Sequence, residues 1–264
     1  MKNIIEIKNL SKQYGTESAL DNFSLSIAKG EIFGLLGPNG SGKSTTINII
    51  IDLISITSGS VKIFGEDIQN KEYKENIGAV PEILGLFEQL KGIEQIYFIG
   101  KIYGLNKNTI KTRSDELFSF FNLKNAKGQM INTYSTGMKK KLALMCALIH
   151  NPDLLILDEP FEGMDPVATK KTKQLFRDLK EQGKTILITS HILGYLENLC
   201  DKVAIINKGK LVYQNTMENV KTEFKNKVNK DESLSALEEI FLDVVGEDEN
   251  SKQTLSWVKN DKKS

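Results

Sequence analysis

The chain has 264 residues and an almost balanced charge, with 35 lysine and arginine residues against 34 aspartate and glutamate residues. This length accommodates one large domain with a substantial subdomain. The even charge does not indicate a nucleic-acid partner or an anionic membrane surface. The chain has no apolar run of roughly 18 residues, the length that spans a membrane, and no apolar signal core at its N-terminus. We therefore expect another chain to provide any membrane attachment.

Almost all of the basic charge is lysine, because Arg113 and Arg177 are the only arginines. An arginine of the same chain is therefore not expected to stabilise the charge of a transition state. Cys146 and Cys200 each lie in an apolar helical pattern. This pattern predicts buried free thiols in a reducing cytosol.

Two strands are predicted near the N-terminus, at residues 4–10 and 19–28, with Tyr14 in the polar turn between them. An exposed aromatic side chain at this place can stack on an adenine ring. Taken alone, however, the residue favours the simpler interpretation of a loop tyrosine that packs locally.

Residues 37–45 match the phosphate-binding pattern G-x-x-x-x-G-K-[ST]. A predicted buried strand at 31–36 precedes them and an apolar helix at 46–51 follows, a context that disfavours an incidental glycine-rich turn. The glycines let backbone N–H groups turn toward a phosphate chain at the positive end of the helix dipole. The pattern predicts that Lys43 reaches the β- and γ-phosphates of a nucleoside triphosphate and that Ser44 ligates Mg²⁺. The candidate phosphate-binding residues are Gly37, Pro38, Asn39, Gly40, Ser41, Gly42, Lys43, Ser44 and Thr45.

Further strands are predicted at 59–65 and 77–82, and Glu82 ends the second, where ligand-facing residues of open α/β sheets lie. From 90 to about 129 the pattern changes to two helices without a strand between them, which predicts an inserted helical subdomain. The first of these helices is apolar over more than half its circumference. Its apolar face is either core or a docking groove for a partner helix, and the sequence does not choose between the two.

Residues 134–138 precede a predicted helix at 139–150 that is apolar nearly all round and therefore buried. Ser135 suits the N-cap position, so we expect Gly137 and Met138 to offer free N–H groups at the positive end of the helix dipole. This arrangement predicts a second anion site. The lysines at 139–141 either strengthen the attraction for an anion or form a solvated face.

Two carboxylates, Asp158 and Glu159, end a predicted buried strand at 153–160. The apolar residues before them place both acids at the ligand edge of the sheet. Beside a Mg·nucleotide, one acid holds the metal and the other accepts a proton from the attacking water. An acid pair at a helix N-terminus is the alternative interpretation.

A later buried strand, predicted at 185–191, delivers His191 to the same edge as a candidate γ-phosphate ligand. The turn 163–166 and an amphipathic helix at 167–182 precede that strand. Beyond it the sequence predicts a β-hairpin at 203–213, a short amphipathic helix at 233–245 and a disordered tail at 246–264.

These segments, in this order, resemble the nucleotide-binding domain of ATP-binding cassette (ABC) ATPases over about residues 2–220. Residues 37–45 resemble the Walker A motif and 154–159 the Walker B motif, while Tyr14 falls at the adenine-stacking aromatic position. Glu82 falls at the Q-loop, 134–138 at the signature, 163–166 at the D-loop and His191 at the switch histidine.

The resemblance implies an α/β fold, a P-loop NTPase core with a mixed sheet, an N-terminal antiparallel β subdomain and an inserted α-helical subdomain. It implies an ABC ATPase domain at 1–220, in which the helical subdomain occupies about 87–151. Residues 221–264 would form a C-terminal extension with one short helix and then a disordered tail.

The resemblance also implies hydrolysis of ATP with Mg²⁺. Glu159, His191 and Lys43 would be catalytic, while Ser44, Asp158 and Glu82 would hold the metal. Besides the Walker A loop, the nucleotide would be contacted by Tyr14, Glu82, Ser135, Gly137 and Asp165.

The family further implies a head-to-tail dimer of ATPase subunits, either a homodimer or a heterodimer. Each ATP would lie between the Walker A motif of one subunit and Ser135 and Gly137 of the other. Backbone amides and a helix dipole of the second subunit would then supply the charge that an arginine finger supplies elsewhere.

The sequence also departs from the usual pattern of the family. The signature reads Tyr-Ser-Thr-Gly-Met where Leu-Ser-Gly-Gly-Gln is usual, and Glu82 replaces the usual Q-loop glutamine. Phe161 stands where threonine is common, and Glu162 replaces a small polar residue. This signature, together with Pro-Glu at the Q-loop, resembles the bacterial ABC-2 type exporter ATPases, which serve drug, peptide, lipid and sodium efflux.

The resemblance therefore implies the ATPase subunit of a membrane transporter, with an exporter as the preferred interpretation. Such a subunit would lie at the cytoplasmic face of the cell membrane. A separate permease chain would be its partner, and no nucleic acid is expected. An importer subunit and a soluble ABC ATPase acting on ribosomes or DNA are the alternatives. The soluble class is disfavoured because the chain has one cassette, no sustained heptads and no basic tracts.

Overall fold

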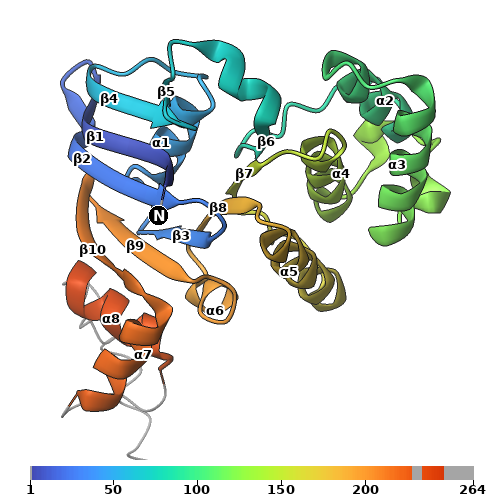
Figure 1. Ribbon diagram of the computed structural model, residues 1–264. Coiled ribbons are helices and arrows are strands. Elements are labelled where there is room, and N and C mark those ends of the chain that lie inside the picture. The colour runs from blue at the N-terminus through green and yellow to red at the C-terminus, as the bar shows by residue number, and fades with distance from the viewer. Residues whose placement is uncertain (1, 228–233, 247–264) are drawn as a thin grey trace, which may run out of the picture.

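The computed structural model describes residues 2–227 and 234–246, which form two β-sheets and the helices around them (Figure 1). The strands are β1 (Asn3–Tyr14), β2 (Glu17–Ala28), β3 (Ile32–Leu36), β4 (Ser58–Ile63), β5 (Glu66–Asp67), β6 (Ile77–Val80), β7 (Leu154–Asp158), β8 (Thr185–Ser190), β9 (Lys202–Asn207) and β10 (Lys210–Thr216). The helices are α1 (Lys43–Ile50), α2 (Gly92–Ile102), α3 (Lys107–Phe120), α4 (Thr136–Leu148), α5 (Pro166–Glu181), α6 (Leu193–Leu196), α7 (Met217–Asn226) and α8 (Ala236–Val245).

The smaller sheet is antiparallel and has the strand order β2-β1-β4-β5. The larger sheet has the order β10-β9-β3-β8-β7-β6. Its strands β9, β3, β8, β7 and β6 run parallel, and β10 pairs antiparallel with β9. The sequence-based prediction of an α/β fold with a mixed sheet and an antiparallel N-terminal β subdomain is therefore confirmed.

The larger sheet is buried on both faces. Because successive side chains of a strand point to opposite sides, each strand contributes to the cores on both faces. In β7, Leu154 and Ile156 belong to the core shared with α1 and the small sheet. Leu155 and Leu157 belong to the core on the other face, with α4 and α5. This two-sided burial explains why the strand is a continuous apolar run. The parallel pairing of β3, β8, β7 and β6 places their carboxyl ends at one edge.

The helix α4 begins at Thr136, earlier than the start predicted at residue 139. The reason is the cap: the Ser135 side chain accepts the N–H of Met138, so the helix starts directly after Ser135. Both cysteines are free, as predicted. The predicted burial holds for Cys200, whereas Cys146 is only half-buried.

Tyr14 is the last residue of β1 and pairs with Glu17, so it belongs to a strand rather than to the predicted polar turn. Its ring is 49% exposed, and the Lys12 ammonium lies 4.9 Å from the ring centroid.

The C-terminal part contains α7 in addition to the helix predicted at 233–245, which the structure places at α8. The helix α7 was not predicted although Met217, Val220 and Phe224 have the spacing of an amphipathic helix, because the residues between them are mostly polar. Its start is fixed by Thr216, whose side chain accepts the N–H of Asn219. The predicted disorder over 246–264 falls, from residue 247 onward, outside the described residues.

Within residues 2–227 and 234–246, no helix is both long enough and apolar enough to cross a membrane.

Candidate functional site

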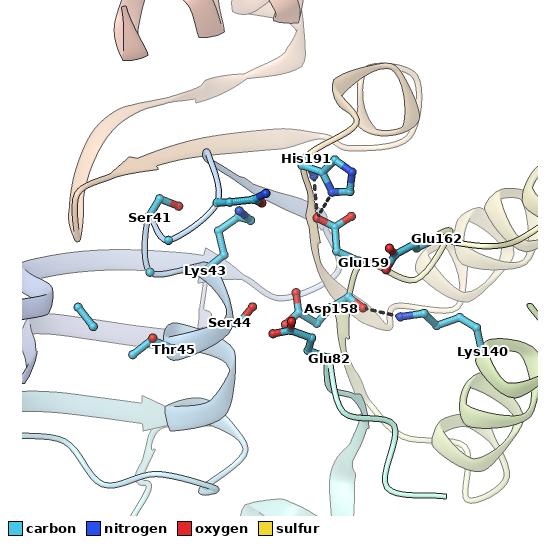
Figure 2. Close-up of a pocket in the computed structure, with 14 residues that line it drawn as sticks. Ser41, Lys43, Ser44, Thr45, Glu82, Lys140, Asp158, Glu159, Glu162 and His191 are labelled. Atoms are coloured by element: carbon cyan, nitrogen blue, oxygen red, sulfur yellow. Dashed lines mark hydrogen bonds and ion pairs between the residues drawn. The ribbon is translucent and has the colours of Figure 1, made fainter. Parts of the chain in front are cut away.

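A pocket of about 590 Å³ opens at the edge of the large sheet where the carboxyl ends of its parallel strands meet (Figure 2). It gathers residues from β2, from the loop after β3 and the first turn of α1, from the end of β7 and just beyond β6, β7 and β8, and from the second turn of α4. The lining residues are Ala19, Asn39, Gly40, Ser41, Gly42, Lys43, Ser44, Thr45, Glu82, Lys140, Asp158, Glu159, Glu162 and His191.

Two glycines of the loop are required by its close packing. A Cβ at Gly37 would lie 2.2 Å from the carbonyl oxygen of Ile206, where no side chain fits. Gly42 has a φ of 112°, which L residues rarely adopt, and a Cβ there would lie 2.8 Å from the Ala19 oxygen. Glycine at these positions therefore lets the loop backbone pack directly against β9 and the start of β2.

The Lys43 ammonium is buried among the loop backbone. Its Nζ donates to the carbonyl oxygens of Gly37 at 2.7 Å and Pro38 at 3.0 Å. Burial lowers the pKa of Lys43, while the charges of Glu159, Asp158 and Glu82 act to raise it. A phosphate chain entering the loop would exchange neutral carbonyl partners for anionic ones, which are the stronger acceptors.

Two buried polar atoms in this pocket have no hydrogen-bond partner among the described residues, Ser41 Oγ and Asp158 Oδ2. The other carboxylate oxygen of Asp158 accepts a short hydrogen bond from the Thr189 hydroxyl. Figure 2 also shows the carboxylates of Glu82 and Asp158 turned toward Ser44. Because buried polar groups normally find partners, these atoms fit a ligand that supplies them, a phosphate at Ser41 and a hard cation at Asp158.

Glu159 has an unusual backbone and a well-defined set of partners. Its φ is 46°, and its N–H donates to the Thr189 hydroxyl at 3.2 Å. Its carboxylate oxygen Oε1 receives the backbone N–H of His191 at 2.8 Å and contacts the His191 ring nitrogen Nδ1 at 2.8 Å. The residues predicted as base and switch histidine are thus brought into direct contact (Figure 2).

Lys140 and Glu162 also line the pocket, where neither has a predicted role. Lys140 is 5% exposed, and its Nζ lies 3.3 Å from the carbonyl oxygen of Asp158. Burial lowers its pKa, against the opposing charges of Glu162 and then of Asp158, Glu159 and Glu82. The burial of Lys140 could have been predicted from the helix. A helix that is apolar nearly all round has no fully solvated face for a lysine in its second turn.

The N-terminus of α4 lies outside this pocket, because neither Ser135 nor Gly137 lines it. The predicted free N–H of Met138 is wrong, since that group donates to Ser135 Oγ at 3.3 Å. Gly137 packs against the turn before α5: a Cβ there would lie 2.3 Å from the carbonyl oxygen of Gly163.

Asp165 and Tyr14 also lie outside the pocket lining. Asp165 is the N-cap of α5 and accepts the N–H of Ala168 at 2.8 Å. Its other carboxylate oxygen pairs with Lys141 of α4 at 3.1 Å. The Ala168 N–H and then the Lys141 ammonium lower the pKa of Asp165. This ion pair links the turn 163–166 to the helix that begins at Ser135.

The glycine loop with its buried lysine, facing an acid pair at the ends of parallel strands, defines a P-loop NTPase. Comparisons with known proteins place it more closely. A family model described as ABC transporter matches residues 20–162.

Two curated relatives match most of the chain. The bacitracin transport ATP-binding protein BcrA of Bacillus licheniformis is 38% identical over 84% of this chain and 72% of its own length. The linearmycin resistance ATP-binding protein LnrL of Bacillus subtilis (strain 168) is 36% identical, over 90% of this chain and 78% of its own length.

Solved structures agree with this. An ATP-binding subunit of an ABC transporter superposes with a TM-score of 0.82 at 29% identity, covering 92% of this chain and all of its own. A dimeric ATP-binding cassette in a post-hydrolysis state, bound to ADP and Pi, superposes with a TM-score of 0.76 at 25% identity, covering 81% of this chain and 98% of its own. The chain belongs to the ATP-hydrolysing ATP-binding proteins of the ABC transporter family.

Proposed function

We propose that this chain is the ATPase subunit of a membrane exporter and works as a head-to-tail dimer, with an identical or homologous subunit, on a separate permease chain. The observation that carries the proposal is the incompleteness of the pocket. It contains the phosphate loop, the acid pair and His191, whereas the capped end of α4 at Ser135 and Gly137 is outside it. That exposed helix end can bind an anion, but it does not reach the nucleotide pocket of its own chain.

Dimerisation is further supported by the related cassette that is dimeric with ADP and Pi bound. Export is supported by the relatives named for bacitracin transport and linearmycin resistance, whose names point to compounds of the drug or peptide type. A subunit of this kind sits at the cytoplasmic face of the membrane, held there by its permease.

Within the dimer, we assign Lys43 to the β- and γ-phosphates and Glu159 to the attacking water as general base. The backbone N–H of His191 holds one carboxylate oxygen of Glu159, which leaves the other oxygen to accept the proton. His191 contributes its ring at the γ-phosphate. Ser135 and Gly137 would face the triphosphate held by the other subunit, with Asp165 positioning the turn beside them and Tyr14 stacking on adenine.

Mg²⁺ is the cofactor that the residues fit best, held by the Ser44 hydroxyl, by Asp158 through its unpaired Oδ2, and by Glu82. Among the described residues no group of three His, Cys, Asp or Glu side chains forms a metal cage by itself. This agrees with Mg²⁺ in phosphate sites, which takes one or two carboxylates and completes its shell with phosphate oxygens and water. The ion would neutralise part of the charge of the triphosphate.

Glu82 gives a first prediction, because it adds a negative charge where the family usually has glutamine. Without Mg²⁺ this charge repels the triphosphate, and with Mg²⁺ it faces the cation. ATP binding by the native chain is therefore expected to weaken more on chelation than binding by Glu82→Gln. ATP titrations of both proteins with and without a chelator test this, and equal ratios of the two affinities would falsify it.

Lys140 gives a second prediction, because its ammonium is the buried counter-charge of Asp158, Glu159, Glu162 and Glu82 and contacts the Asp158 carbonyl. Lys140→Met is expected to slow hydrolysis by about tenfold, since groups in one charge network interact by roughly 0.5–3 kcal/mol. Adding Glu162→Gln should restore part of the rate, because one uncompensated carboxylate is removed.

Lys139→Met is the matched control for this prediction. Lys139 is the preceding lysine on α4, but it pairs with the exposed Glu88 and does not line the pocket. A similar loss in Lys139→Met, or additive losses in the Lys140→Met/Glu162→Gln double variant, would contradict the charge-balance explanation.

The permease surface is assigned to the exposed apolar side chains beside Glu82. Ile83 is 86% exposed and Phe87 is 52% exposed. The Phe87 ring packs edge-on against the ring of Phe98 in α2, with 5.4 Å between the ring centroids. Exposed apolar side chains that follow a pocket residue so closely in the sequence suit a partner helix better than water.

The experiment that tests the function as a whole is purification of the tagged chain from native membranes, followed by identification of the polytopic protein that stays bound. That protein should be lost from Phe87→Asp and kept by Leu53→Asp, a control at another exposed apolar side chain. Association with ribosomes or DNA in place of a polytopic protein would overturn the proposal.

The domain assignment belongs to the same proposal. Residues 1–220 would be the ABC ATPase domain, with the helical subdomain at about 87–151. Residues 221–264 would be a C-terminal extension that includes α8 and the end of α7.

A further inference from the structure

A second cavity, of about 440 Å³, lies between α5 and α6 and shares no lining residue with the nucleotide pocket. Three basic side chains of α5 line it, Lys170, Lys173 and Arg177. Positions spaced by three and four residues lie on the same face of a helix, so the three cations face one space. Among the described residues, no carboxylate lines this cavity.

These cations have no anionic partner in the part of the chain that the structure describes. Arg177 donates to two neutral acceptors, the carbonyl oxygen of Asn198 at 2.8 Å and the side chain of Gln174 at 3.4 Å. Lys173 contacts aromatic faces instead, 5.2 Å from the Tyr195 ring centroid and 5.6 Å from that of Phe161. By contrast Lys180, further along α5, forms an ion pair with Asp201.

The environment of Lys173 disfavours its charge. Burial, and then the nearby Arg177, lower the pKa of Lys173. A half-buried ammonium beside a guanidinium is costly unless an anion compensates both. The cavity wall also contains Thr169, which is 7% exposed and whose hydroxyl has no hydrogen-bond partner among residues 2–227 and 234–246. In the described part of the chain, cationic charge without a counter-ion and a buried hydroxyl without a partner thus belong to residues that line one cavity.

We propose that this cavity is a binding site for a small organic phosphate. The phosphate group would lie against Lys170, Lys173 and Arg177, whose planar guanidinium suits two phosphate oxygens at once. The cavity is within the roughly 300–1,000 Å³ of small-molecule sites, which is more room than a phosphate ion needs. The remaining walls include Met164 and Tyr195, so the body of the ligand would be flat and apolar.

The position of this site connects it to the catalytic loops. Met164 precedes Asp165 in the turn that leads into α5, and Tyr195 lies on α6, directly downstream of His191. A ligand bound here would therefore touch the two segments that border the proposed dimer interface and the nucleotide pocket. Binding at this site requires neither the permease nor a dimer, because every lining residue belongs to one chain.

The test is calorimetric titration of the full chain with phenyl phosphate, in the presence of saturating Mg·ADP so that the nucleotide pocket is already filled. One further site is expected. Lys173→Met and Arg177→Gln should each weaken its affinity by about tenfold or more, since hydrogen bonds to charged groups are worth about 1.5–3 kcal/mol. Lys180→Gln, a control on the same helix outside the cavity, should leave it unchanged.

Titrations with the two halves of phenyl phosphate show which half provides the affinity. Phenol should not bind, and inorganic phosphate should bind more weakly than phenyl phosphate. If Lys173→Met does not fold, Lys170→Gln on the exposed rim replaces it, with a smaller but measurable loss expected. Three results would overturn the proposal. Phenyl phosphate would not bind, or it would bind the three cavity variants as tightly as the native chain, or it would bind no better than inorganic phosphate. A cavity variant that impairs only ATP-dependent dimerisation would also overturn it, because the cations would then face a second copy of the chain.

Discussion

Replacing Glu159 by Gln is expected to slow ATP hydrolysis by about 10²- to 10⁴-fold while ATP still binds. The amide retains an oxygen that can accept the N–H of His191, so the local structure should persist. It cannot accept a proton from water, which removes general-base catalysis. Steady-state hydrolysis and ATP affinity, measured on the same preparation, separate the two effects.

Because hydrolysis would end the closed state, Glu159→Gln should also accumulate as an ATP-bound dimer. Size-exclusion chromatography with Mg·ATP detects this species. Glu162→Gln is the matched control, a neighbouring pocket carboxylate that makes no contact with His191 among those the structure describes. It should lose much less activity. If native protein and Glu159→Gln both remain monomeric, the head-to-tail arrangement fails for the isolated subunit.

Ser135→Arg is expected to abolish hydrolysis and to leave ATP affinity of the monomer nearly unchanged. Ser135 is exposed and lies outside the nucleotide pocket of its own chain. A large cation at this helix end would fill the space where the γ-phosphate of the other subunit enters. Hydrolysis rate and monomer affinity are the two measurements, and a wild-type rate would contradict the assignment of Ser135 to the partner's nucleotide.

Two further variants separate this role from the capping of α4. Loss of an N-cap costs about 0.5–2 kcal/mol, so Ser135→Arg alone could act through stability. Ser135→Asp keeps a capping oxygen for Met138 and repels a triphosphate, and should also be inactive. Ser119→Arg makes the same substitution at an exposed serine of α3 and should remain active.

Mixing Ser135→Arg with Lys43→Ala subunits tests whether the two nucleotide sites act together. A head-to-tail dimer of these chains has one intact site and one site with both defects. If hydrolysis requires both sites, little activity should return. Recovery of the full rate expected from the intact sites would mean that the sites work independently.

Much of the catalytic pocket was predictable because its parts are local in sequence. The glycine loop, the acid pair after a continuous apolar strand and His191 after another each carry their signal within a few residues. Parallel strand order then brings them to one edge, so Lys43, Asp158, Glu159 and His191 meet as predicted. Glu82 joins them from the end of β6, as its place after a strand indicated.

Other features were not predicted, for different reasons, and one of them depends on a contact between distant segments, which periodicity does not report. Lys140 was interpreted with its neighbours as an anion attractor or a solvated face, because only the packing of α4 against β7 shows that it is buried beside Asp158. The occupied N–H of Met138 depends on the rotamer of the Ser135 cap. The helix α7 was missed although Met217, Val220 and Phe224 have amphipathic spacing, because the mostly polar residues between them favoured a loop.

The close approach of Gly137 to Gly163 has a consequence for sequence drift in the signature. A Cβ at position 137 would meet the Gly163 carbonyl at 2.3 Å, so any larger residue must displace the segment that carries Asp165. Position 136, in contrast, is exposed at the start of α4 and already holds a β-branched residue, Thr136. The first signature glycine is therefore free to diversify, as it has done here, while the second is fixed by sterics before any chemistry is considered. A saturation library at 136 and 137 should accordingly yield many folded variants at the first position and almost none at the second.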